Sequence, residues 1–284
     1  MFKKRKSVML FLLPGLAFIL CFYIIPFIGG IQYSLSSGGR ESHFVGFENY
    51  INVWNNTMFQ IGFGNTLQLS CICAPLLWLL SFLTATGLSS LIPRGRSIRT
   101  AIMLPYLTPS SAILLIWLIL FDYGGPVNRI VQALGNTRIM WLESSMLRVP
   151  IILLFLWKNL GFCTIIFSAA LQSVPASLYE YAKIEGAGFG TRTFKITLPL
   201  IIPSAFLVFV LAWINAFKIF KEVYFIAGGY PDRAVYTLQH FMNNMFSKMN
   251  YQYVTSASYF FSLFVLALFG VLFILQRRAV RSMI

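Results

Sequence analysis

Residues 254–275 read VTSASYFFSLFVLALFGVLFIL and contain no charged side chain. An α-helix needs roughly 20 mostly apolar residues to cross the hydrocarbon core of a bilayer. Comparable runs lie near residues 8–31, 66–91, 100–121, 149–171 and 199–227. Transmembrane β-strands would instead be short and would alternate apolar with polar residues. The sequence therefore predicts an all-α membrane protein with six transmembrane helices.

The composition agrees with this prediction. Hydrophobic residues make up 58% and charged residues 11% of the 284 residues, more apolar material than a soluble domain of this size could bury. Lys3, Lys4, Arg5 and Lys6 precede the first run, as basic residues do in a signal peptide. That run is longer than the apolar region of a signal peptide, about 7 to 15 residues, so we expect an uncleaved first helix.

The basic residues are unevenly divided between the two sides of the predicted bundle. Six spans put both termini on the same side as residues 92–99 and 172–198, and this side carries 13 of the 22 Lys and Arg residues, against 6 on the other. The positive-inside rule then predicts cytoplasmic termini and a cytoplasmic segment 172–198. Anionic lipid headgroups account for the net charge of +14 without a nucleic acid partner.

No catalytic, cofactor-binding or metal-binding site is expected. The four cysteines lie in predicted spans, where a thiol packs as a small hydrophobe: Cys21, Cys71, Cys73 and Cys163. His43 and His240 are far apart in the sequence. The phosphate-binding pattern Gly-x-x-x-x-Gly-Lys-Ser/Thr does not occur, so any ATP that drives this protein must bind another chain.

The segment between the fourth and fifth runs predicts an amphipathic helix. Pro175 suits a first helical turn, and Gly186 permits a bend before a second short helix at residues 192–197. Two sets of side chains point to opposite sides of the first helix: Leu178, Tyr181 and Ala182 on one, Glu180 and Lys183 on the other. These residues alone fit a helix that lies on the membrane as well as one that docks a partner.

Residues 180–199 carry a pattern that resembles a known signature. Glu-x-Ala-x-x-x-Gly, nine residues and then Ile-x-Leu-Pro is similar to the cytoplasmic loop of permease subunits of binding-protein-dependent ABC importers. The matching positions are Glu180, Ala182, Gly186, Ile196, Leu198 and Pro199, with Tyr181 in place of the usual alanine. The stretches FVGFENY at 44–50, RTAIMLP at 99–105, GGPVN at 124–128 and LQSVP at 171–175 resemble the carbohydrate branch, the family of the maltose and glycerol-3-phosphate permeases.

The resemblance implies a type I ABC importer permease fold, with a single transmembrane domain over residues 1–284 and a coupling loop at 175–198. The residues implied in ATPase coupling are Leu178, Glu180, Tyr181, Ala182, Gly186, Leu198 and Pro199. The implied partners are a second permease, with a heterodimer favoured, two cytoplasmic ATPase subunits that hold ATP and Mg, and an extracytoplasmic solute-binding protein. Residues 124–148 would form one surface for the binding protein, and the location would be a bacterial or archaeal inner membrane.

Polar and aromatic residues inside the spans are candidates for a substrate pathway. Phe155, Lys158, Asn159 and Phe162 recur at helical spacing in the fourth run, and the fifth contributes Trp213, Asn215 and Lys218. Aromatic rings with hydrogen-bonding groups suit a saccharide. The same groups could instead join helices or reach to the headgroups. We also expect Lys218 to pair with Glu222 at the i, i+4 spacing of a helix.

Two other classes of protein fit the sequence less well. A self-contained secondary transporter or channel would explain the spans, but it would need an inverted repeat or a carboxylate near mid-membrane, and the sequence shows no convincing instance of either. A membrane-bound enzyme would need a cluster of His, Asp or Glu, which is also not evident. We expect a non-enzymatic permease that imports a sugar or oligosaccharide.

Overall fold

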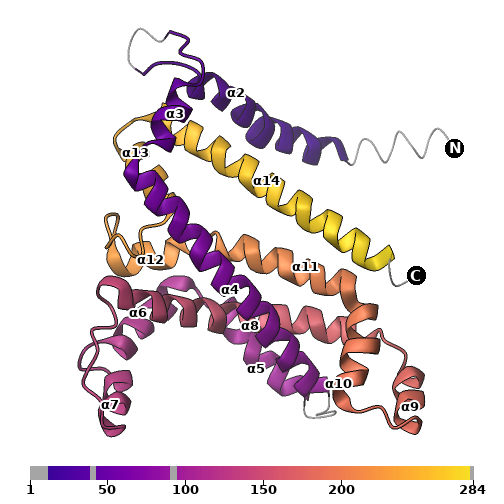
Figure 1. Ribbon diagram of the computed structural model, residues 1–284. Coiled ribbons are helices and arrows are strands. Elements are labelled where there is room, and N and C mark those ends of the chain that lie inside the picture. The colour runs from indigo at the N-terminus through magenta and orange to yellow at the C-terminus, as the bar shows by residue number, and fades with distance from the viewer. Residues whose placement is uncertain (1–11, 39–42, 90–94, 282–284) are drawn as a thin grey trace, which may run out of the picture. The chain divides into compact units, whose positions relative to one another are not determined.

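The computed structural model describes residues 12–38, 43–89 and 95–281 (Figure 1). Within them every regular element is a helix, and the one β-type contact is an isolated bridge between Ser36 and Phe44. The described residues do not include five basic residues that contribute to the predicted orientation: Lys3, Lys4, Arg5, Lys6 and Arg94.

The helices run in chain order as η1 Leu20–Ile24, α2 Ile25–Ser34, α3 Glu48–Trp54, α4 Thr57–Ser89, α5 Gly95–Leu107, α6 Ser110–Phe121, α7 Pro126–Ala133, η2 Ser144–Leu147, α8 Arg148–Gln172, α9 Ala176–Ile184, α10 Phe189–Arg192, η3 Thr193–Thr197, α11 Leu198–Ala216, α12 Phe220–Ala227, α13 Leu238–Ser247 and α14 Tyr251–Arg281. Six stretches are long and apolar enough to cross a membrane: Leu12–Ser34, Thr57–Ser89, Ser110–Ala133, Ser145–Gln172, Phe189–Ala227 and Tyr251–Arg278. The predicted all-α, six-span fold is confirmed.

The chain divides into two compact units. The first comprises residues 1–60 and 241–265. In it, Asn49 joins α3 to the end of α2, because its side-chain amide donates to the carbonyls of Ser34 and Ser36 at 3.0 and 2.9 Å. The ring of Trp54 stacks on Phe260 of α14 with 5.0 Å between centroids. These contacts hold the short helix α3 on the two longer helices.

The second unit comprises residues 61–240 and 266–284 and has α8 in its core. α8 is apolar on nearly every side, so it can be buried on several faces at once. Its Phe167 is fully buried and meets Trp78 and Phe82 of α4 edge-on at 5.7 and 5.5 Å. Such aromatic pairs contribute about 0.5–1.5 kcal/mol beyond the area that they bury.

Gly161 brings α5 and α8 into close contact. A Cβ at this position would lie 2.1 Å from the carbonyl oxygen of Ile102, so only a residue without a side chain fits. Small residues allow two transmembrane helices to approach at the level of their backbones. The two helices are therefore packed more tightly here than ordinary side chains permit.

Two of the predicted spans are not continuous helices. The run at 100–121 forms α5 and α6, with Thr108 and Pro109 between them. The residue before a proline is disfavoured in the helical conformation, and this explains the break. The run at 199–227 forms α11 and α12, separated at Phe217–Ile219 by a turn in which Ile219 N–H donates to the Ala216 carbonyl.

Candidate functional site

The loop that joins α8 to α11 contains the predicted helix and the predicted bend. α9 follows Pro175, and Gly186 has a φ of +75°, a conformation that glycine adopts without steric cost. Gly186 N–H donates to the Lys183 carbonyl and Ala187 N–H to the Ala182 carbonyl, at 3.0 and 2.8 Å. This pair of bonds is the Schellman pattern that ends a helix at a left-handed residue. The bend at Gly186 is thus built into the helix end.

A hydrogen-bond chain seats α9 on the second half of the loop. The hydroxyls of Tyr179 and Thr197 lie 2.9 Å apart, and the Thr197 hydroxyl donates to the Arg192 carbonyl at 3.2 Å. Ala182 is half-buried, whereas Leu178 and Tyr181 are exposed. The predicted common face of these three residues is therefore split, with Tyr179, which the sequence analysis did not single out, turned inward.

Several large apolar side chains of the loop are exposed. Leu178, Tyr181 and Ile184 follow at three-residue spacing on α9 and are 39%, 70% and 82% exposed. Phe189 and Phe194 of the following segment are also exposed. Glu180 and Lys183 add charge to the same helix. Apolar groups gathered on a short surface helix typically mark an interaction site.

The junction between the loop and α11 is a π-helical turn, η3. Pro199 has no N–H with which to continue an α-helical ladder, and the preceding Leu198 N–H donates five residues back to the Thr193 carbonyl. Leu198 and Pro199 are half-buried at the start of α11. Single π turns inside helices frequently lie at functional sites.

An ion pair joins α8 to α12. Lys158 Nζ lies 3.5 Å from Glu222 Oε1, and the two side chains are only 15% and 11% exposed. Lys158 also donates to the hydroxyl of Ser110 on α6. The pair of Lys158 and Glu222 is the only salt bridge among the described residues. A buried charge of either sign is expensive unless paired, so this contact holds three helices together.

The expected pair between Lys218 and Glu222 is wrong. Lys218 lies in the interruption between α11 and α12 and is exposed, so the helical spacing that would bring it to Glu222 is lost. Glu222 instead meets Lys158, which is 64 residues away in the sequence. Phe155, Lys158, Asn159 and Phe162 form the predicted substrate strip on α8. Within this strip, Lys158 joins α8 to α6 and α12.

The other strip residues pack within the protein. Asn159 is 9% exposed and donates to the Phe155 carbonyl at 2.8 Å, and Phe155 is 4% exposed. Phe162 stacks on Tyr106 of α5 with 4.7 Å between centroids and 8° between ring planes. A role for these residues in lining a pathway stays a prediction.

Trp213 and Asn215 lie on α11. Trp213 is 7% exposed and packs between the rings of Phe209 and Phe217. Its indole nitrogen has no hydrogen-bond partner among the described residues. Asn215 is half-buried. A buried indole donor without an acceptor is available to a polar group that enters between the helices.

Metal chemistry has no evident basis in the described residues, where no group of three or more His, Cys, Asp or Glu side chains is placed to hold an ion. The cysteines there are free thiols. Two site residues escaped the sequence analysis altogether, Tyr179 and Ser110. Their signal is tertiary, since each matters through a partner at least 18 residues away.

Comparisons with known proteins agree with the geometry. Residues 72–284 match the family model described as binding-protein-dependent transport system inner membrane component. The sn-glycerol-3-phosphate transport system permease protein UgpA of Yersinia pestis bv. Antiqua (strain Antiqua) is 32% identical, over 81% of this chain and 79% of that protein. The trehalose/maltose transport system permease protein MalF of Thermococcus litoralis is 28% identical, over 88% and 86%.

A solved structure shares the fold. A chain of a bacterial ABC transporter involved in the import of the acidic polysaccharide alginate superposes with a TM-score of 0.85 and 21% sequence identity, covering 97% of this chain and 96% of that one. The fold predicted from the resemblance is confirmed. The family model matches three quarters of this chain. The chain therefore belongs to the inner membrane components of binding-protein-dependent transport systems.

Proposed function

We propose that this chain is the permease subunit of an ATP-driven sugar or oligosaccharide importer, in which it forms half of the translocation pathway. The observation that carries the proposal is the loop at residues 175–198. It combines a glycine-capped helix with exposed Leu178, Tyr181 and Ile184, in a chain whose sequence has no phosphate-binding loop. A separate ATPase is the partner that such a loop requires.

In this proposal α9 docks in a cleft of a cytoplasmic ATPase. The three apolar side chains enter the cleft, and Glu180 meets a basic group of the partner. Gly186 fixes the angle of α9 to the segment that continues through Leu198 and Pro199 into α11. ATP and Mg are bound by two ATPase subunits, with no cofactor in this chain. ATP binding shifts the permease between states only as far as the ATPase contacts this loop differently in each.

A second interaction surface lies at the other end of the second unit. Figure 1 shows α7 and α9 at opposite ends of α8. Ile130 of α7 and Leu134 directly after it are 62% and 74% exposed, while Asn128 is buried and ties α7 to the Ile139 backbone. We assign this firmly held apolar surface to an extracytoplasmic binding protein. Both chain termini would then be cytoplasmic, in a bacterial or archaeal inner membrane.

The class of solute rests on the relatives. Their names state sn-glycerol-3-phosphate, trehalose/maltose and, for a protein of Agrobacterium fabrum that is 29% identical, sulfoquinovosyl glycerol. All are small polyhydroxylated compounds. A pathway that passes Phe155, Lys158, Asn159 and Phe162 on α8 and Trp213, Asn215 and Lys218 near α11 would offer them aromatic faces and hydrogen-bond donors. A second, different permease would complete this pathway as a heterodimer.

The loop can be tested with a matched pair of glycines. A Cβ at Gly186 or at Gly188 meets nothing within 4 Å, but only Gly186 has a positive φ. An L-residue in the left-handed conformation costs about 1–2 kcal/mol. We expect Gly186→Ala, and more strongly Gly186→Val or Glu180→Lys, to uncouple ATP hydrolysis from uptake while the complex still assembles. Gly188→Ala should transport as the wild type does.

The assay is reconstituted in proteoliposomes with both permeases, the ATPase and the binding protein. ATP hydrolysis should rise with solute only when the binding protein is present, and the ATPase should co-purify with this chain. If the Gly186→Val variant and the Glu180→Lys variant both took up solute at the wild-type rate, the result would contradict the role of the loop. Uptake by the purified chain without an ATPase would favour the alternative, a self-contained secondary transporter or channel.

A further inference from the structure

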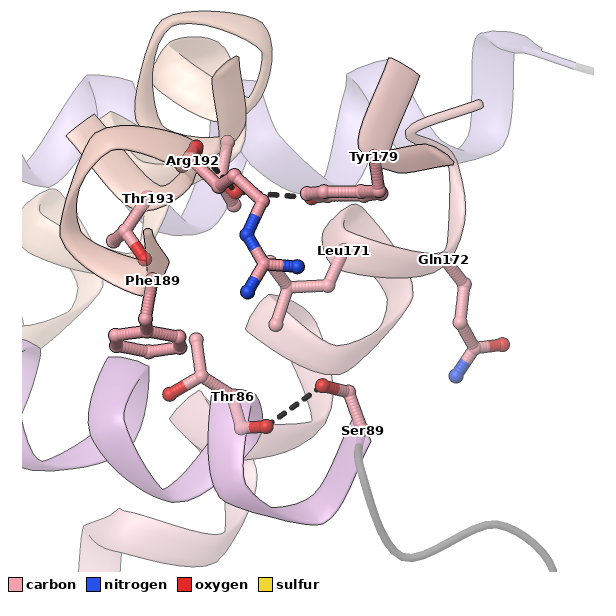
Figure 2. Close-up of a pocket in the computed structure, with 9 residues that line it drawn as sticks. Thr86, Ser89, Leu171, Gln172, Tyr179, Phe189, Arg192 and Thr193 are labelled. Atoms are coloured by element: carbon pink, nitrogen blue, oxygen red, sulfur yellow. Dashed lines mark hydrogen bonds between the residues drawn. The ribbon is translucent and has the colours of Figure 1, made fainter. Parts of the chain in front are cut away.

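A cavity of about 300 Å³ lies within the second unit, and Tyr179 of α9 is part of its lining (Figure 2). Its walls come from the end of α4, the end of α8, one residue of α9 and the segment after Gly186. The lining residues are Thr86, Ser89, Leu171, Gln172, Tyr179, Phe189, Arg192, Thr193 and Thr197. Ser89 and Gln172 are the last residues of α4 and α8, so the cavity lies where two of the candidate spans end.

Among the lining residues that the structure describes, Arg192 is the only charged one. Its side chain is half-buried, and the Nε atom is buried with no hydrogen-bond partner among the described residues. Figure 2 shows the guanidinium reaching into the space between Tyr179, Leu171 and Thr86. A buried donor without an acceptor carries an unrecovered desolvation cost, which an entering acceptor would remove. The cavity thus presents a cationic donor to a group that enters it.

The chemistry of the lining favours a phosphate group. The planar fork of an arginine matches phosphate oxygens in a bidentate manner. The hydroxyls of Thr86 and Ser89 already donate to carbonyls of α4, at 2.9 and 2.7 Å, so an entering phosphate would depend on the guanidinium rather than on these two hydroxyls. Leu171 and Phe189 add apolar wall beside it. A phosphate with an attached glycerol and acyl chain would satisfy both parts of this lining.

We propose that this cavity binds the phosphate of an anionic phospholipid headgroup. The ends of spans lie at the depth of the headgroups, and basic pockets between transmembrane helices are suited to anionic lipids. The Arg192 carbonyl accepts from Thr197, which in turn meets Tyr179 of α9. A bound headgroup would therefore stiffen the support of the loop helix, and the lipid composition of the membrane would affect coupling.

The test measures binding by the full chain, without a transport assay. Phosphatidylglycerol and phosphatidylcholine are titrated into the detergent-solubilised protein, and lipid adducts are counted by native mass spectrometry. We expect Arg192→Gln to weaken phosphatidylglycerol binding about tenfold, the usual scale for one charge-assisted contact. Lys195→Gln, which removes an exposed cation three residues away, is the matched control and should bind as the wild type does.

A second variant guards against misfolding. Thr86→Phe fills the cavity from α4 at a half-buried position and leaves every charge in place, and it should also weaken binding about tenfold. Equal weakening by Arg192→Gln and Lys195→Gln would show diffuse surface attraction and overturn the proposal. So would unchanged lipid binding in both Arg192→Gln and Thr86→Phe.

A parallel arm separates the possible sources of the phosphate. The melting temperature is measured in inorganic phosphate and in chloride at equal ionic strength. Stabilisation of the wild type by phosphate, absent in Arg192→Gln, together with lipid binding that the variants do not change, would assign the site to a soluble phosphate and overturn the lipid. Loss of ATPase co-purification in Arg192→Gln, with both kinds of binding unchanged, would mean that an acidic group of the partner fills the cavity, which also overturns the proposal.

Discussion

Removing one member of the buried ion pair between Lys158 and Glu222 should cost more than removing both. At the observed 3.5 Å and an effective dielectric constant of about 20, the attraction is about 5 kcal/mol. Desolvation of the two charges, which are 15% and 11% exposed, offsets part of it. We expect Glu222→Gln and Lys158→Met each to lower the free energy of unfolding by about 3 kcal/mol, because each leaves a lone charge between helices. The double variant should lose about 1 kcal/mol or less.

The assay is equilibrium unfolding in mixed micelles of detergent and sodium dodecyl sulfate, followed by circular dichroism. Lys221→Met is the control, since Lys221 is exposed beside Glu222, and it should change the free energy by no more than about 0.5 kcal/mol. A double variant whose loss equals the sum of the two single losses would refute the reasoning, because additivity means that the two charges do not interact.

Two further predictions concern packing and pH. Gly161→Ala should lower the free energy of unfolding by about 1–3 kcal/mol, because the new methyl group would meet the Ile102 carbonyl. Gly64→Ala is the control: the space around its Cβ is open, so the variant should be neutral or stabilised by up to about 1 kcal/mol. Thermal unfolding of both variants measures these changes. Burial lowers the pKa of His240, on α13 outside the candidate spans, from 6.5 to about 4, partly opposed by the nearby polar backbone of Gly228. Between pH 6.5 and 4, His240 takes up a proton in the unfolded chain but not in the folded one. The contribution of His240 to the free energy of unfolding is therefore fully present above pH 6.5, and about 3 kcal/mol is lost as the pH drops to 4. Melting curves of the wild type and His240→Gln across this range check it, since the variant should lose that part of the pH dependence.

The sequence was sufficient for the spans and for the shape of the loop, because both depend on local pattern. Long uncharged runs have one stable arrangement in a bilayer, and Gly186 stands where a helix must end in a left-handed residue. The breaks inside two spans were less accessible. Pro109 is a local sign of a helix break, but it lies in a continuous apolar run that predicts a single span. The turn at Phe217–Ile219 contains no proline or glycine that would indicate a break.

Long-range pairings could not be read from the sequence. The i, i+4 rule assigned Glu222 to Lys218 because the rule assumes an unbroken helix, and a turn between the two residues removed that premise. The true partner, Lys158, became available only when α8 packed beside α12. Tyr179 is a similar case: its place on α9 gives no sign that its hydroxyl meets Thr197 at the start of the next span.

The contact at Gly161 also has a mechanical consequence. Because the two backbones are in contact, α5 and α8 have no clearance to slide past each other at Gly161. Phe162, the next residue of α8, is also held against α5 by its stacking on Tyr106. α8 leads directly into the loop that carries α9. A displacement of that loop would therefore move α5 together with α8, because the two helices cannot slide past each other at Gly161.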